Sequence, residues 1–249
     1  MEPVSIVAAY RFVELKDCDT LRQQLLSRAQ DLLLKGTVLL APEGINFNLA
    51  GSTAHMQRWL DLLTQDSRFQ GLELKQHTAS QVPFKRLLVK VKREIIRMNE
   101  EGVRPQAGRA PSVDAATLAR WLSAGHCDEG RPVVMLDTRN GFEVDAGAFE
   151  GALDWRLQKF SDFPAAAAAH REALAGKTVV SYCTGGIRCE KAALWMLDAG
   201  MEHVLQLDGG ILRYFEEAPG APHWQGRCFV FDEREALDVQ LRGLPVEQH

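Results

Sequence analysis

Short apolar runs of strand length alternate with helical patterns through the second half of the chain. The runs Val133–Asp137, Thr178–Tyr182 and Val204–Leu207 are rich in aliphatic and β-branched residues. Such nearly continuous apolar strands are typical of parallel sheets whose two faces are both buried. We therefore predict a doubly wound α/β domain with helices at about 114–124, 165–175 and 190–199.

The first hundred residues alternate in a different order. Strand patterns cover 6–12, 37–41, 47–50, 72–76 and 84–91, and helical patterns cover 19–35 and a segment from the N-cap Ser52 through Thr64. The order βαββαβ with a late extra strand predicts an α+β domain of the ferredoxin-like type. We expect this front domain at 1–98, a linker rich in Gly, Pro, Arg and Gln at 99–111, the α/β domain at 112–220, and a C-terminal extension at 221–249.

The composition is that of an ordinary soluble globular protein. Hydrophobic residues make up 46% of the chain, and no run of about 18 apolar residues occurs that could cross a membrane. The five cysteines are scattered without a Cys-x-x-Cys pair, and the seven histidines have no metal-ligand spacing. We expect a cytoplasmic protein with reduced thiols, without a membrane partner or a bound metal; nothing in the pattern indicates an oligomeric state.

One cysteine stands in a loop that favours reactive chemistry. Cys183 ends an apolar strand, and a helix begins close behind it, after the turn residues Thr184, Gly185, Gly186, Ile187 and Arg188. A glycine-containing turn before a helix aims backbone N–H groups at one point, and these groups and the arginine favour thiolate over thiol. A lone cysteine at a strand end is more simply a buried small residue, but the two glycines and Arg188 favour a nucleophile.

The length of this loop bears on its chemistry. A cysteine phosphatase needs five residues between its cysteine and arginine to surround a phosphate, whereas four residues separate Cys183 from Arg188. The smaller ring suits a single sulfur or oxygen atom carried on the thiol, as in a cysteine persulfide or an oxidised sulfur intermediate.

Other polar residues are candidates for supporting this loop. Asp137 and Arg139 follow a strand, and we expect them to brace the loop through an ion pair or hydrogen bonds. Cys189, at the start of the next helix, is either a resolving thiol or a packed small residue. Cys228 lies in an apolar setting, and we predict a structural role for it.

A basic segment marks the front domain as a candidate RNA-binding module. The first hundred residues carry 14 Lys and Arg against 11 Asp and Glu, whereas the remainder carries 15 against 22. The excess is concentrated in Lys85, Arg86, Lys90, Lys92, Arg93 and Arg97. This segment is either a phosphate-binding surface or an edge strand that its lysines protect from pairing. In the turn Pro42–Asn46, Glu43 and Asn46 either contact substrate or belong to a tight connection.

Motifs spread over most of the chain resemble known families. Asp137-Thr138-Arg139, the Cys183 loop, Gly147–Ala152 and Leu207–Gly210 together resemble a rhodanese domain spanning about 110 to 220. The segment from Cys183 to Lys191, with the Pro42–Asn46 turn and Cys228–Arg234, resembles more narrowly the bacterial rhodanese-domain family of oxygen-dependent tRNA uridine hydroxylases.

This resemblance implies hydroxylation of the wobble uridine of tRNA at C5, with molecular oxygen as co-substrate and Cys183 as the catalytic thiol. The sequence has no flavin or nicotinamide fingerprint and no recognisable iron-binding triad, so we recognise no cofactor. Two alternatives stay open: a rhodanese-type sulfurtransferase that carries a persulfide on Cys183, and a non-catalytic tRNA-binding protein with an inactive rhodanese fold. The intact Cys183 counts against the second alternative.

Overall fold

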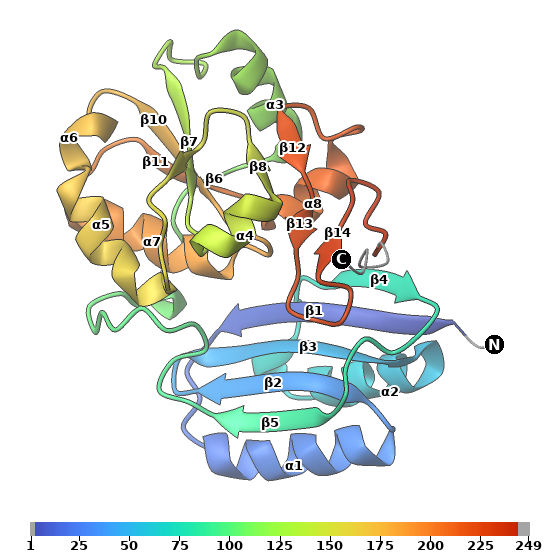
Figure 1. Cartoon of the computed structure of the whole chain (residues 1–249). Helices are drawn as coiled ribbons and strands as arrows, with labels where there is room; N and C mark the ends of the chain where they lie inside the picture. Colours follow the sequence, from blue (N-terminus) through green and yellow to red (C-terminus); the bar gives the residue numbers. More distant parts are fainter. Residues whose placement is uncertain (1–2, 244–249) are drawn as a thin grey trace. The chain divides into compact units, whose positions relative to one another are not determined.

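A computed structural model of the protein describes residues 3–243 and divides the chain into two compact units (Figure 1). The first unit is Met1–Arg97 and the second is Met98–His249. Residues 1–2 and 244–249, which include the last six residues of the expected C-terminal extension, lie outside the described part.

The first unit is a five-stranded sheet with two helices. Its sheet order is β4-β1-β3-β2-β5, with every pair antiparallel except β2 and β5. This arrangement is the ferredoxin-like fold with one added strand, as the sequence predicts. Its elements are β1 (Val4–Phe12), α1 (Cys18–Asp31), β2 (Lys35–Ala41), β3 (Gly44–Ser52), α2 (Thr53–Thr64), β4 (Lys75–Ala79) and β5 (Leu87–Val91).

One apolar core joins the helices of the first unit to its sheet. It contains Leu25 of α1, Trp59 of α2 and Phe47 of β3, and the rings of Phe47 and Trp59 meet edge to face at 5.0 Å. The expected helix end at Lys35 is wrong. Helix α1 stops at Asp31 because Leu33 adopts a left-handed backbone (φ 52°) and the N–H of Leu34 turns back to the carbonyl of Ala29.

The strand expected at 72–76 is also displaced. Pairing with β1 sets the observed strand β4 at Lys75–Ala79, where Ala79 lies opposite Val4 and Lys75 opposite Ala8. The preceding residues form a turn at Gly71, whose φ is +71°.

The second unit is built on a parallel sheet of order β6-β11-β10-β7-β9. This sheet confirms the predicted doubly wound α/β fold. The elements are β6 (Ser112–Val113), α3 (Ala115–Ala124), β7 (Val133–Asp137), α4 (Gly141–Ala146), β8 (Gly147–Phe149), β9 (Leu153–Asp154), α5 (Phe163–Ala169), α6 (Arg171–Leu174), β10 (Thr178–Tyr182), α7 (Ile187–Asp198), β11 (Val204–Leu207), α8 (Gly210–Glu217), β12 (Trp224–Gly226), β13 (Cys228–Phe229) and β14 (Ala236–Leu237).

The central strand β10 carries the loop of interest at its carboxyl end. Every residue of β10 is buried, and Val180 and Tyr182 belong to the core cluster formed with helices α3 and α8. Tyr182 lies opposite Asp137, the last residue of β7. The segments that follow these two strands, at Cys183 and Thr138, therefore emerge at the same edge of the sheet, where open α/β sheets bind their ligands.

Three local expectations for the second unit need correction. The alanine-rich helix expected at 165–175 is two short helices, α5 and α6, separated at His170, whose φ and ψ are −106° and 11°. Helix α7 begins at Ile187 rather than at 190, because Gly186 adopts a left-handed φ of +95° and acts as its N-cap. For the C-terminal extension at 221–249 the sequence predicts one short strand, whereas its described part, 221–243, contains the three short strands β12 to β14. Within residues 3–243, none of the helices has the length and apolar character to cross a membrane.

Candidate active site

The loop after β10 surrounds the sulfur of Cys183 with hydrogen-bond donors. The backbone N–H of Gly186 donates to Cys183 Sγ at 3.1 Å, and the nearby backbone N–H groups of Arg188 and Cys189 act to lower the pKa of this thiol. The side chain of Cys183 is fully buried. The predicted anion nest is therefore present, and its occupant in the folded chain is the cysteine sulfur itself.

Helix α8 holds the other side of the same loop. The N–H of Ile211 donates to the carbonyl of Cys183 at 3.0 Å, and that of Leu212 donates to the carbonyl of Thr184 at 3.1 Å. Gly210 lies so close that a Cβ on it would meet the Cys183 oxygen at 2.5 Å. The first turn of α8 thus supplies the donors for the loop carbonyls. The N–H of Gly186, within the loop, points instead to the Cys183 sulfur.

The two cysteines of the site have opposite pKa shifts. Burial by itself would raise the pKa of Cys183, but the hydrogen bond from the Cys189 thiol, the charge of Arg188 and the backbone N–H groups lower it to about 5. Burial and the neighbouring Cys183 raise the pKa of Cys189. The opposite shifts favour a Cys183 thiolate beside a neutral Cys189 thiol.

Cys189 contacts a second group across the site. The Oγ1 of Thr138 lies 3.5 Å from Cys189 Sγ and donates to the carbonyl of Tyr182 at 3.0 Å. The Cys189 thiol is thus packed and hydrogen-bonded at the same time. Its role as a resolving thiol stays a prediction.

Arg188 is bound on its far side by a carboxylate that the sequence pattern did not indicate. Its Nη1 and Nη2 donate to Oε2 and Oε1 of Glu143 at 2.6 and 2.7 Å, and both side chains are buried. Glu143 Oε2 also accepts the N–H of Asn140 at 3.0 Å, as in a helix capping box. The Asn-x-x-Glu spacing is the sequence signal for that cap, but it does not predict the pairing with Arg188.

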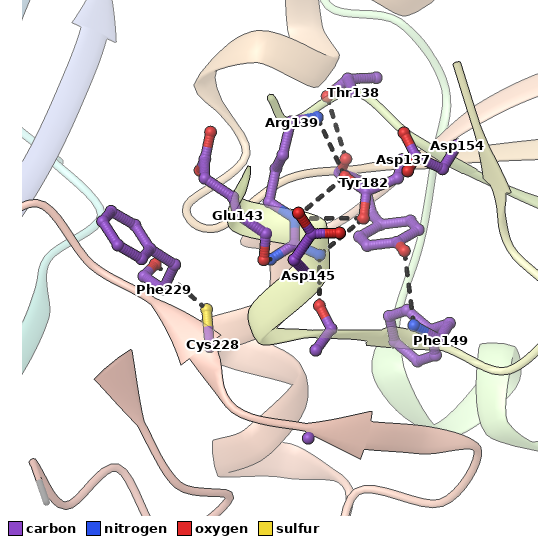
Figure 2. Close-up of polar contacts among 12 residues, drawn as sticks. Asp137, Thr138, Arg139, Glu143, Asp145, Phe149, Asp154, Tyr182, Cys228 and Phe229 are labelled. Atoms are coloured by element: carbon purple, nitrogen blue, oxygen red, sulfur yellow. Dashed lines mark hydrogen bonds and ion pairs between the residues drawn. The ribbon is translucent and has the colours of Figure 1, made fainter. Parts of the chain in front are cut away.

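Asp137 and Arg139 form an ion pair with each other, and Arg139 also contacts α4 and β8; direct bracing of the Cys183 loop by this pair stays a prediction. Arg139 Nε and Nη2 bind the two Asp137 oxygens at 2.9 and 2.6 Å (Figure 2), and both side chains are fully buried. Arg139 also donates to the backbone carbonyls of Glu143 at 3.3 Å and Gly147 at 2.7 Å. The pair thus fixes the element that carries Glu143, and through Glu143 it supports Arg188.

Cys228 reaches the same region from the C-terminal strands. Its side chain is buried, and its Sγ bonds to the carbonyl of Phe229 at 3.7 Å (Figure 2). Burial raises the pKa of Cys228 to about 12, although the charge of Arg139 and the hydroxyl of Thr184 act in the opposite direction. Cys228 is therefore a neutral thiol beside the loop, a position that the sequence pattern did not indicate.

The remaining candidates belong to the first unit. All six basic side chains of the 85–97 segment are exposed, and β5, which carries Lys90, is an edge strand. Glu43 Oε1 accepts the N–H of Ile95 at 2.7 Å, and Asn46 Nδ2 donates to the Ile95 carbonyl at 3.2 Å. These two side chains tie the Pro42–Asn46 turn to the chain that follows β5.

The reactive group of the site is the sulfur of Cys183, and the charges next to it are those of Arg188 and Glu143. Across residues 3–243, no three His, Cys, Asp or Glu side chains gather in a group that could hold a metal ion. The arrangement of loop donors and arginine can hold a nucleophilic thiolate at neutral pH.

Comparison with known proteins identifies both units. Residues 4–95 match the model described as the UPF0176 acylphosphatase like domain, and residues 115–217 match the rhodanese-like domain. A rhodanese-like domain from Anabaena, solved in solution, is 24% identical over 47% of this chain and 79% of its own, with a TM-score of 0.37.

Relatives of known name match nearly the full chain. The tRNA uridine(34) hydroxylase of Bordetella petrii is 61% identical and covers 97% of this chain and 95% of its own length. That of Delftia acidovorans is 57% identical, over 99% of this chain and 93% of its own. These relatives confirm the resemblance found in the Cys183 loop and its flanking motifs, and the chain belongs to the tRNA uridine(34) hydroxylase family.

Proposed function

We propose that this protein is an oxidoreductase that hydroxylates C5 of the wobble uridine of tRNA, with Cys183 as the catalytic thiolate. One observation carries the proposal. A thiolate held by backbone N–H groups, a neighbouring thiol and a paired arginine stands in a chain 61% identical to a hydroxylase named for this uridine. A nucleophile of this kind is ionised at neutral pH and needs no separate base to activate it.

Molecular oxygen is the proposed co-substrate. Hydroxylation replaces the C5–H bond by C5–OH, so one oxygen atom enters the product and the other leaves as water. That balance takes up two electrons and two protons, which we assign to a thiol reductant in solution.

The first unit is the proposed site of tRNA binding. Its six exposed basic side chains lie on the edge strand β5 or in the segments just before and after it, where we expect them to contact phosphates along one side of the sheet. Glu43 and Asn46 hold the backbone of Ile95, two residues before Arg97, so they support the position of this basic segment.

Sulfur transfer is the second candidate, and the rhodanese-like domain favours it. The small nest around Cys183 also suits a persulfide, whose terminal sulfur would replace the present hydrogen-bond acceptor. We place either reaction in the cytoplasm, since all five cysteines are free thiols, as in a reducing compartment.

One assay separates the two candidates. Purified full-length protein is incubated with unmodified tRNA and a thiol reductant, under air or under argon, and the nucleosides are analysed by mass spectrometry. We expect 5-hydroxyuridine only under air, carrying a label from isotopically enriched oxygen gas, and none with Cys183→Ser. Thiouridine formed from a sulfur donor, equally with and without oxygen, would instead establish sulfur transfer.

A further inference from the structure

Three phenylalanines form an exposed aromatic cluster on the second unit. Phe142 lies in the first turn of α4, Phe229 in β13, and Phe231 two residues further on. The ring centroids are 5.2, 6.3 and 5.2 Å apart, with interplanar angles of 84°, 90° and 78°. Phe142 and Phe231 are 50% and 61% exposed. A single exposed apolar side chain is ordinary, but a cluster of aromatic rings marks a binding surface.

Buried and exposed side chains alternate along residues 227–231, and this pattern directs Phe229 and Phe231 outward together with the charged side chain of Arg227. Cys228 and Val230 are buried, Phe229 is partly buried, and Arg227 and Phe231 are exposed. An extended chain sends successive side chains to opposite sides, so Arg227, Phe229 and Phe231 share the outer side. Arg227 makes no ion pair with any residue in the described range 3–243. The outer side therefore offers aromatic rings and an available positive charge.

Backbone pairing holds the cluster in place. Strands β8 and β12 pair antiparallel, with Gly147 opposite Gly226, and the N–H of Arg227 donates to the Ala146 carbonyl at 2.7 Å. A Cβ on Gly147 would meet the Arg227 nitrogen at 2.5 Å. This close approach fixes the C-terminal segment against the end of α4, so the three rings belong to one rigid surface.

Both segments of the cluster are attached directly to the active site. Phe142 precedes Glu143, the carboxylate that binds Arg188. Phe229 follows Cys228, whose thiol lies close to Arg139 and Thr184. Two of the three rings therefore belong to residues that are direct neighbours in sequence of groups near the Cys183 loop. Phe142 is next to Glu143, and Phe229 is next to Cys228.

The chemistry of this surface fits an unpaired nucleobase. Aromatic rings stack on the faces of bases that have left a helical stack, and arginine binds phosphate or stacks in the same way. A uridine that is to react must also leave its stack, which exposes the faces of its neighbours. We propose that Phe142, Phe229 and Phe231, with Arg227, form a stacking site for an unpaired base of the tRNA anticodon loop. The inference rests on the proposed function, because that function supplies a single-stranded loop as substrate.

The test measures binding of the full-length protein to a hairpin RNA with an anticodon stem-loop sequence. Phe231 is the best target, since its exposure means that replacing it leaves the core intact. We expect Phe231→Ala and Phe231→Leu each to weaken hairpin binding about 10-fold, and Phe231→Tyr to stay within about twofold, because only tyrosine keeps a ring. Binding of a fully paired RNA of the same length should not change. The matched control is Leu33→Ala, at a 75% exposed apolar residue of the first unit.

Three results would overturn the stacking site. Phe231→Leu could bind the hairpin as tightly as the unchanged protein, the decrease could be equal for paired RNA, or Phe231→Ala could abolish self-association while leaving RNA binding intact. Hydroxylation is scored separately. Ring-dependent hairpin binding without formation of 5-hydroxyuridine refutes the proposed reaction alone, whereas hydroxylation with ring-independent binding refutes the stacking site alone.

Discussion

The carboxylate of Glu143 accepts two hydrogen bonds from the guanidinium of Arg188, of 2.6 and 2.7 Å, with both groups buried behind the Cys183 loop. The positive charge next to the thiolate is therefore oriented and partly balanced by a fixed negative charge. Arg188 acts on Cys183 through its charge and its backbone N–H, while two of its five side-chain N–H groups donate to Glu143.

Replacing Glu143 by Gln should separate the effect of the Glu143 charge on Cys183 from the role of Glu143 in holding the loop in shape. Gln keeps the shape of the side chain but leaves a buried arginine without a counter-charge, so unfolding in urea should show a loss of about 3 kcal/mol. The pKa of Cys183, measured from the pH dependence of alkylation, should fall further, because a negative charge has been removed from its surroundings. A higher pKa in this variant would mean that Glu143 acts mainly by holding the loop in shape.

Cys183→Ser should remove hydroxylation and leave the fold intact, because serine is nearly isosteric but far less acidic. The same variant tests the linkage between ionisation and stability. A pKa lowered from 9.0 to about 5 means that ionisation of Cys183 stabilises the folded state fully above about pH 9, and not at all below about pH 5. The stability difference between the two proteins should therefore grow as pH rises from 5 to 9. A difference that does not change with pH would show an ordinary thiol.

Gly210→Ala should disrupt the active-site loop from the α8 side. Gly210 has a φ of +70°, and its new Cβ would lie 2.5 Å from the Cys183 oxygen and 2.8 Å from the Gly186 nitrogen. The matched control is Gly125→Ala, where φ is +77° but no atom lies within 4 Å. The control should lose about 1–2 kcal/mol of stability from the left-handed backbone alone. The Gly210 variant should lose more and should also show a raised pKa for Cys183 in alkylation; equal losses would contradict the close approach.

Charge reversal at Lys90 and Lys92 tests the proposed RNA surface of the first unit. Both side chains are exposed, and strand alternation puts them on one side of the edge strand. The double variant Lys90→Glu, Lys92→Glu should bind tRNA more weakly, with a salt dependence whose log–log slope falls by about 0.9 for each phosphate that the protein no longer binds. Lys16→Glu with Lys159→Glu changes the net charge equally at other exposed lysines. If the two double variants behave alike, β5 is only a protected edge strand.

The parts of the site that the sequence predicts are those set by neighbours along the chain. The strand before Cys183, the glycine turn and the helix start lie within about a dozen residues, so pattern and backbone preference suffice for them. The pairing of Glu143 with Arg188 joins residues 45 apart, and its partners are chosen only when α4 packs beside the loop. The end of α1 was missed for another reason, since Leu33 takes a left-handed backbone that pattern arguments reserve for glycine.

The contact of the Cys183 loop with helix α8 has a consequence during protein synthesis. Residues 211 and 212, which bind the loop carbonyls, leave the ribosome after the cysteine. Until then helix α8 does not hold the loop carbonyls, and we expect the thiol of the nascent chain to have ordinary acidity. We therefore expect the newly made cysteine to be largely protonated, and less readily oxidised, until helix α8 is available to fold.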